Sequence, residues 1–257
     1  MSKGIQVSLV SNAGVLVEIN ETKMLIDALW EHSEAYSSPP EEIHEQMLYG
    51  TAGSKWRNAD YLLFTHLHKD HFEQDVVIEY LQYNNVRSVY FDSRPAVAES
   101  DKLEQYLAER ELVHGRFGLQ CDSYKHWQLN EQLAVTAICT PHMGIHAHQD
   151  HVAIVLHGGG KHLLFVADAE FPLPIFKQAL GGIRPDAVFL NPVHFYSKRA
   201  LRFVVEELQV KKIVAYHIPF AGEGNSVFRR MISKKLDSVG TIIPVDILWN
   251  IGDCLEI

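Results

Sequence analysis

The chain has 257 residues, of which 47% are hydrophobic, and a formal net charge of −9. A chain of this length can bury a substantial core, and the acidic balance without a basic block disfavours a dedicated nucleic-acid surface. No apolar run has the length of a membrane span or of a signal-peptide core, so we expect a cytoplasmic protein that does not contact membranes. The three cysteines are odd in number and widely spaced, which indicates reduced thiols: Cys121, Cys139 and Cys254.

The first predicted elements are strands. Residues 5–10 and 14–19 form an expected antiparallel pair, and residues 23–27 form a third strand. The pattern then breaks over residues 30–58, apart from a short helix predicted over 41–49. An insertion of this kind is predicted to form a lid or a pocket wall.

The apolar run 61–64, which predicts a buried strand, leads directly into the segment Thr65-His66-Leu67-His68-Lys69-Asp70-His71. Neutral imidazole and carboxylate groups are standard ligands for zinc and neighbouring transition metals. His66 and His68 are two positions apart, so in an extended chain their side chains point the same way and can bind one ion. Asp70 and His71 follow where the chain must turn, and they can face a second ion. The segment therefore predicts a metal site.

Strands and helices alternate along the rest of the chain. Helices are predicted over residues 73–83, 96–108, 173–180, 200–208 and 226–235, and strands over residues 87–91, 134–139, 152–156, 163–166, 187–190 and 213–215. Strands in hairpins, followed by strands that alternate with helices, predict two sheets with helices outside.

The segment from His66 to His71 resembles the His-x-His-x-Asp-His signature of the metallo-β-lactamase superfamily. Later landmarks come in the family's order, because His142, Asp168 and His217 each follow an apolar run. The resemblance implies a four-layer αβ/βα sandwich formed by one domain over residues 1–257, with the metal site at one edge between the sheets. Ala167 departs from the family pattern, which usually has Gly before the Asp.

The resemblance also implies a ligand set. His66, His68 and His142 would hold one divalent ion, and Asp70, His71 and His217 would hold a second. Asp168 would bridge the two ions, which we expect to be Zn²⁺, with Mn²⁺ or Fe²⁺ as alternatives.

The third ligand has alternatives, because four histidines crowd one stretch. His142 is favoured because it directly follows a strand, and His146, His148 and His151 remain candidates. Cys139 lies three residues before His142 and is interpreted as a buried strand cysteine, with a ligand role as the alternative.

Two further residues have hypothetical supporting roles. Asp27 ends a predicted strand and could accept hydrogen bonds from a ligand histidine or from the backbone of the motif, or could be an ordinary capping residue. His194 follows the predicted strand 187–190, in a loop that borders the active site in the family, and could act as a general acid or bind a substrate oxyanion. A surface histidine is the alternative for His194.

These features predict a metal-dependent hydrolase that uses a metal-bridged hydroxide, oriented by Asp70, on a small-molecule substrate: an ester, lactone, amide, thioester or phosphodiester. The chain also resembles the ascorbate-phosphate lactonase-like branch. The alternatives are a mononuclear-iron or di-iron oxidoreductase of the same superfamily, and a nuclease. The acidic net charge disfavours the nuclease. The sequence leaves the oligomeric state open.

Overall fold

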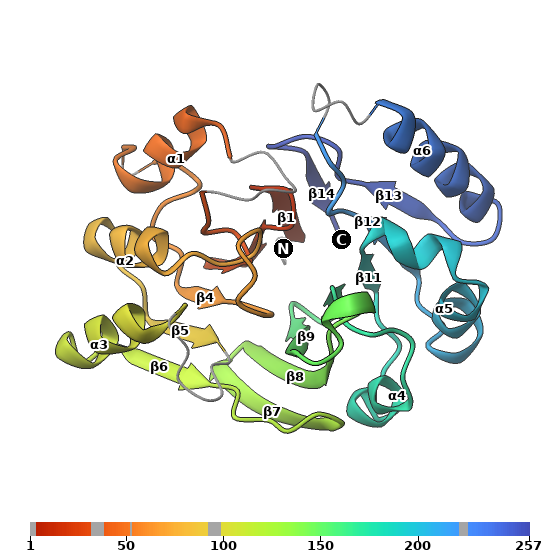
Figure 1. The fold of residues 1–257 in the computed structure, drawn as a ribbon, viewed down its shortest axis with the longest axis horizontal. Helices are drawn as coiled ribbons and strands as arrows, with labels where there is room; N and C mark the ends of the chain where they lie inside the picture. The colour runs from red at the N-terminus through yellow and green to blue at the C-terminus, as the bar shows by residue number, and fades with distance from the viewer. Residues whose placement is uncertain (1–3, 32–38, 52, 92–98, 221–225) are drawn as a thin grey trace. The chain divides into compact units, whose positions relative to one another are not determined.

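A computed structural model of the chain describes residues 4–31, 39–51, 53–91, 99–220 and 226–257. These residues form two compact units. The N-terminal unit comprises Ile5–Gly118 together with Ile251–Glu256, and the C-terminal unit is built from Leu119–Asn250. Each unit contains one sheet and its own helices (Figure 1).

The N-terminal unit contains a seven-stranded mixed sheet of described residues, in the order β14-β1-β2-β3-β4-β5-β6. The predicted hairpin is confirmed, because β1 and β2 pair antiparallel with Ile5 opposite Ile19. From β3 to β6 the pairing is parallel, so these strands end at the same edge. The strands are β1 (Ile5–Leu9), β2 (Val15–Ile19), β3 (Thr22–Ile26), β4 (Tyr61–Leu63), β5 (Ser88–Phe91), β6 (Val113–Arg116) and β14 (Cys254–Glu256).

The described helices along this sheet are α1 (Glu41–Leu48), α2 (Gln74–Tyr83) and α3 (Asp101–Glu109) (Figure 1). The helical spacing predicted for α2 is confirmed, since its buried residues are Val76, Val77, Tyr80 and Leu81. Within the predicted lid 30–58, residues 32–38 and 52 lie outside the described residues. Met47, Leu48 and Trp56 of the same stretch are buried in the core between helices and sheet, so α1 belongs to the helical layer.

The C-terminal unit contains a second seven-stranded mixed sheet of described residues, in the order β13-β12-β11-β10-β9-β8-β7. Strands β7 to β10 are antiparallel and β10 to β13 are parallel. Its central strands are long apolar runs because both of their faces are buried. The strands are β7 (Ser123–Asn130), β8 (Leu133–Pro141), β9 (Asp150–Gly158), β10 (Lys161–Ala167), β11 (Ala187–Leu190), β12 (Lys212–Ala215) and β13 (Val245–Ile247).

Helices α4 (Pro174–Leu180), α5 (Lys198–Arg202) and α6 (Ser226–Gly240) share one core with this sheet. The single helix predicted over 200–208 is divided, because α5 continues as a π-helical turn over Phe203–Glu207. Short 3₁₀ turns cover Gly144–His146 and Pro192–Tyr196. The predicted architecture of two sheets with flanking helices is confirmed, and none of the described helices combines the length and apolar composition needed to cross a bilayer.

Among the described residues, four strands have no counterpart among the predicted elements, and all four are edges of the two sheets: β6, β7, β13 and β14. An edge strand pairs on one side only and tolerates polar, exposed side chains, so it lacks the apolar run that indicates a strand. Strand β7 illustrates this, since all of its residues are exposed or half-buried.

A row of polar side chains crosses four strands of the C-terminal unit. Thr136 Oγ1 lies 2.9 Å from His126 Nδ1 and 2.8 Å from His157 Nε2, and His157 Nδ1 lies 2.8 Å from His162 Nδ1. Burial, followed by the repulsion of His162 and His126, lowers the pKa of His157 to about 4. The folded state therefore binds fewer protons here than the unfolded state. The stability that this site contributes is present above the unfolded pKa, near 6.5, and is lost as the pH falls towards 4.

The variant His157→Gln should flatten this pH dependence. After a discount for the partial exposure of His157, we expect the wild type to lose about 1 kcal/mol more unfolding free energy than the variant between about pH 7 and pH 5. Urea unfolding at both pH values measures the difference, with His114→Gln, an exposed histidine of the N-terminal unit, as the control. Equal losses in wild type and His157→Gln would contradict the assignment.

Candidate metal centre

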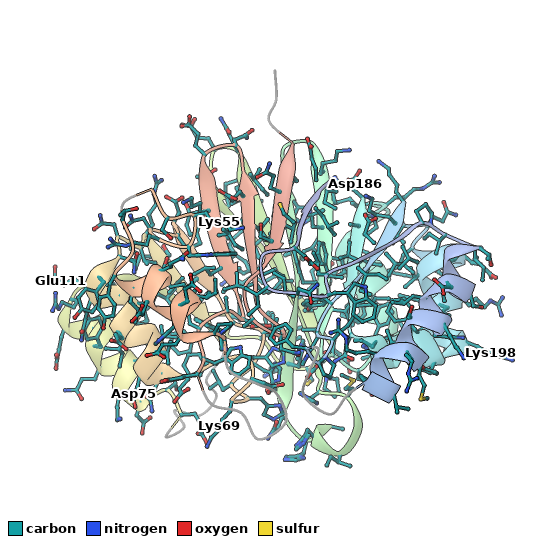
Figure 2. The ribbon with its side chains drawn as sticks, turned by 90° about the horizontal axis from the view of Figure 1, so that it is seen from above. Lys55, Lys69, Asp75, Glu111, Asp186 and Lys198 are labelled. Carbon is teal, nitrogen blue, oxygen red and sulfur yellow. The ribbon has the colours of Figure 1, made fainter. Side chains whose placement is uncertain are left out.

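The histidine-rich segment follows β4, at the edge where the parallel strands β3, β4 and β5 end. His66 and His71 are buried, whereas His68 and Asp70 are half-buried. The backbone turns at His68, whose carbonyl accepts hydrogen bonds from the amides of His71 and Phe72, both at 2.9 Å. Figure 2 shows Lys69, the exposed residue of the segment, at the surface. The turn gathers three imidazoles and one carboxylate, as the sequence predicted.

Asp27 is the buried anchor of this segment. Its Oδ1 accepts a hydrogen bond from the Thr65 amide at 2.8 Å, and its Oδ2 accepts one from the Thr65 hydroxyl at 2.7 Å. The same Oδ2 lies 2.9 Å from Nδ1 of His71. The carboxylate therefore holds both the backbone of the segment and one of its imidazoles. This confirms the supporting role suggested for Asp27.

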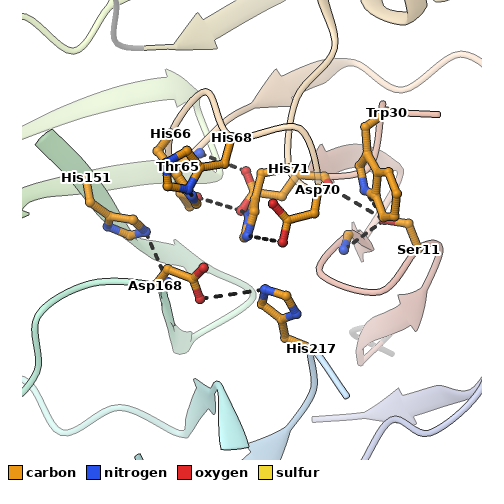
Figure 3. A network of polar contacts seen from close by, with 12 residues as sticks. Ser11, Trp30, Thr65, His66, His68, Asp70, His71, His151, Asp168 and His217 are labelled. Carbon is orange, nitrogen blue, oxygen red and sulfur yellow. Dashed lines mark hydrogen bonds and ion pairs between the residues drawn. The ribbon is translucent and has the colours of Figure 1, made fainter. Parts of the chain in front are cut away.

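These contacts fix the tautomers of two imidazoles. The Thr65 hydroxyl donates its proton to Asp27, so its oxygen accepts from His66 Nδ1 at 3.0 Å. The Nε2 atom of His66 then carries a lone pair and lies 3.0 Å from His68 Nδ1 (Figure 3). In the same way, the contact between His71 Nδ1 and Asp27 places the proton on Nδ1 and the lone pair on Nε2. In each of these imidazoles, one nitrogen is held by a hydrogen bond and the other carries a lone pair. This arrangement fits a metal site.

The C-terminal unit contains a group of its own at the edge where β8, β10 and β12 end. The Asp168 carboxylate has Oδ2 at 3.6 Å from His142 Nε2 and Oδ1 at 3.6 Å from His217 Nε2. His142 Nδ1 donates to the Met143 carbonyl at 2.8 Å, which leaves the lone pair on Nε2. Figure 3 shows the contact of Asp168 with His217. Asp168 therefore lies between two imidazoles, and carboxylate and imidazole groups together are a donor set for divalent metal ions.

Among the four crowded histidines, His142 has its Nε2 atom 3.6 Å from the Asp168 carboxylate. His151 is buried, but its Nε2 accepts a hydrogen bond from the Asp168 amide at 3.2 Å. His146 and His148 are exposed. Cys139 is buried within β8, as its interpretation as a strand cysteine predicted.

Three residues at these strand ends have a left-handed backbone. The φ angles are +52° at Asp27, +46° at Ala167 and +58° at His217. For residues with a Cβ atom this conformation costs roughly 1–2 kcal/mol, and such strain clusters at functional sites. The angle at Ala167 gives a physical reason for the family's usual Gly before the Asp, because glycine adopts positive φ without a Cβ clash.

His194 lies in the 3₁₀ turn Pro192–Tyr196 and is buried. Burial lowers the pKa of His194 to about 4, although the Asp168 carboxylate and a hydrogen bond to the Ala167 backbone oppose this shift. The neutral ring has its proton on the nitrogen that bonds the Ala167 carbonyl. The other nitrogen, Nε2, is buried without a hydrogen-bond partner among the described residues. This environment favours a role as an acceptor over the expected role as a general acid.

Asn191 was missed as a site residue in the sequence. Its carboxamide Nδ2 donates to Asp168 Oδ1 at 2.7 Å, which steadies the carboxylate. Its position in the sequence could have identified it. Asn191 directly follows β11, and the neighbouring strands β10 and β12 are followed by Asp168 and His217 at the same edge. Asn191 is also the cap of the turn that carries His194, since its Oδ1 accepts from the Val193 amide at 3.1 Å.

No protein-family model and no curated protein matches the sequence. Solved structures do match. A possible metal-dependent hydrolase from Veillonella parvula has 13% identity and a TM-score of 0.65, over 99% of this chain and 100% of that one. The metallo-beta-lactamase fold protein YhfI from Bacillus subtilis has 13% identity and a TM-score of 0.61, over 99% and 100%. CmlA, a diiron beta-hydroxylase from Streptomyces venezuelae, has 15% identity and a TM-score of 0.63, over 100% of this chain and 55% of that one.

Proposed function

Because the chain has the metallo-β-lactamase fold, we propose that it is a metal-dependent hydrolase of a small-molecule substrate. The observation that supports this most strongly is the pair of ligand groups at the strand ends of the two units. One is the segment from His66 to His71 anchored by Asp27, and the other is Asp168 between His142 and His217. Each group presents imidazole lone pairs next to a carboxylate, which is the donor set of zinc and related divalent ions.

The proposed ligand set assigns the residues to two ions. His66, His68 and His142 would hold the first, Asp70, His71 and His217 would hold the second, and Asp168 would bridge them. We propose Zn²⁺, with Mn²⁺ or Fe²⁺ as alternatives. When bound, such ions lower the pKa of a water molecule towards neutrality and stabilise negative charge on a substrate oxygen.

The side chains of the protein then have distinct roles. Asp70 is half-buried, which lets it orient the attacking water and accept its proton. Asp168 is oriented by the Asn191 carboxamide and, through its amide, by His151. His194 Nε2 is an acceptor in a dry environment and can receive a hydrogen bond from substrate. The reaction class is hydrolysis of an ester, lactone, amide, thioester or phosphodiester.

The experiment that tests this function is a screen of metal-loaded protein against these five substrate classes, paired with elemental analysis. We expect bound divalent metal, and turnover of at least one class that stops on chelation and returns with added Zn²⁺. Retention of the same metal content by His66→Ala would overturn the ligand assignment. Absence of chelator-sensitive turnover in all five classes would overturn the proposed hydrolysis.

The identity of the third ligand gives a separate prediction. His142→Ala should weaken metal binding by at least about 10-fold, because a ligand beside Asp168 is lost. His148→Ala is the matched control, since it removes an exposed imidazole six residues away and should leave the affinity unchanged. Competition with a chromophoric chelator measures both affinities. The reverse order would reassign the third ligand to His148.

An oxidoreductase is the second candidate, because CmlA shares the fold over the whole of this chain. The donor set contains more imidazole than carboxylate, which suits zinc better than a di-iron centre rich in harder oxygen ligands. Oxygen uptake by the Fe²⁺-loaded protein, in place of hydrolysis by the Zn²⁺-loaded protein, is the result that would favour this candidate.

A further inference from the structure

Two thiols and one carboxylate meet in the C-terminal unit, on the sheet face opposite to His151. Cys139 lies in β8, and Asp150 opens β9. Because Asp150 pairs with Pro141, two residues after Cys139, the alternation of side chains places Cys139 and Asp150 on one face of the sheet. His151 pairs with Thr140 and therefore belongs to the opposite face.

A turn brings the second thiol to this face. The turn over residues 120–123 is closed by a hydrogen bond of 3.1 Å from the Ser123 amide to the Gln120 carbonyl, with φ of +60° at Asp122. The Asp122 amide donates to the Cys139 carbonyl at 3.1 Å, and Ser123 pairs with Cys139 as β7 begins. The turn is therefore fixed to β8, and Cys121 is held beside Cys139.

The three side chains form one donor cluster. The Cys121 thiol donates to Asp150 Oδ1 at 2.9 Å. One ligand atom from each of Cys121, Cys139 and Asp150 lies within 4.8 Å of the other two. Cys139 is buried, whereas Cys121 and Asp150 are exposed, so the cluster opens to solvent on one side. The donors are thus preassembled, and an ion can reach them from water.

Binding of a cation at this cluster is linked to the loss of thiol protons. Partial burial, the hydrogen bond to Asp150 and the repulsion of its carboxylate raise the pKa of Cys121 to about 11. In the absence of a metal ion, the Cys121 thiol is therefore protonated at neutral pH. A divalent ion would displace the thiol protons to solvent and would balance most of the resulting negative charge of two thiolates and one carboxylate.

We propose that Cys121, Cys139 and Asp150 bind a thiophilic divalent cation of the Zn²⁺ type, in a site separate from the histidine centre. Two thiolates and one carboxylate supply three corners of a tetrahedron, and water can complete the fourth. The three ligands come from the turn 120–123 and from strands β8 and β9. An ion bound there links these three segments near the sheet edge formed by β7.

Cobalt titration of the reduced, metal-free protein tests this site. A thiolate-to-Co²⁺ charge-transfer band reports sulfur ligation only, so the histidine centre, which has no sulfur ligand, does not contribute to the band. We expect a saturable band in the wild type and its loss in Cys121→Ser, which changes an exposed residue and should not disturb folding. Cys254→Ser is the matched control, because it removes another exposed thiol, in β14 of the N-terminal unit, and should keep the band.

A second measurement separates metal binding from disulfide formation. Zn²⁺ should protect Cys121 from a thiol-specific reagent while Cys254 continues to react, and Asp150→Asn should weaken this protection by at least about 10-fold. Absence of the cobalt band, or its persistence in Cys121→Ser, would overturn the site. A Cys121–Cys139 disulfide that forms in air in the presence of saturating Zn²⁺ would also overturn it.

Discussion

Replacing Asp70 with Ala should reduce turnover of any hydrolysed substrate by about 10²–10⁴-fold, the usual contribution of a positioned acid–base group. The expectation rests on the position of this carboxylate, whose Oδ2 lies 3.8 Å from His71 Nε2 and which remains partly accessible. Because Asp70 is only half-buried and follows the end of a strand, its truncation should leave the fold intact. Steady-state kinetics together with the unfolding temperature measure the two effects.

Asp75→Ala is the matched control for this variant. Asp75 is a strongly exposed carboxylate in the first turn of α2, where it pairs with Lys102 at 3.0 Å. An exposed ion pair contributes little, so this variant should keep both turnover and stability. Unchanged turnover in Asp70→Ala, with metal content equal to that of the wild type, would remove Asp70 from the mechanism.

Replacing Asp27 with Asn should weaken metal binding by about 10–100-fold while leaving most of the stability in place. Asn has almost the same shape as Asp and tolerates the positive φ at this position. One oxygen can still accept the Thr65 amide. The NH₂ group then faces His71 Nδ1, which must become an acceptor, so the imidazole proton moves to Nε2. The nitrogen proposed to bind the metal is thereby blocked.

A second variant at this position separates a change of tautomer from a simple loss of packing. Asp27→Ala should instead destabilise the protein by about 2–4 kcal/mol, because the buried Thr65 amide loses its acceptor. Asp60→Asn is the matched control in the same unit, since Asp60 accepts the Lys23 amide at 2.9 Å and immediately precedes β4. We expect Asp60→Asn to keep full metal affinity. Nitrogen-15 NMR of the His71 ring reads the tautomer directly, and an unchanged tautomer in Asp27→Asn would refute this account.

Interior strands and core helices were predictable because burial leaves a strong pattern in the sequence. Strand β11 was predicted with its observed bounds, and α2 with its buried face. The four edge strands were missed, because an edge has no apolar run to detect. The histidine-rich segment was predictable for a different reason. Its ligands are neighbours in the chain, so their spacing alone brings them together.

The sequence by itself determined the class of chemistry, since three imidazoles and one carboxylate within six residues have few uses other than metal binding. Tertiary structure decided which residues support that chemistry. The roles of Asp27 and Asn191 depend on hydrogen bonds of 2.7–2.9 Å across 23 to 44 residues of sequence. Strand register likewise places His142, among the four crowded histidines, beside Asp168. It also places Cys121 next to Asp150. Such contacts are set by how strands pair and turn, and residue type carries no direct signal of which distant strands become neighbours.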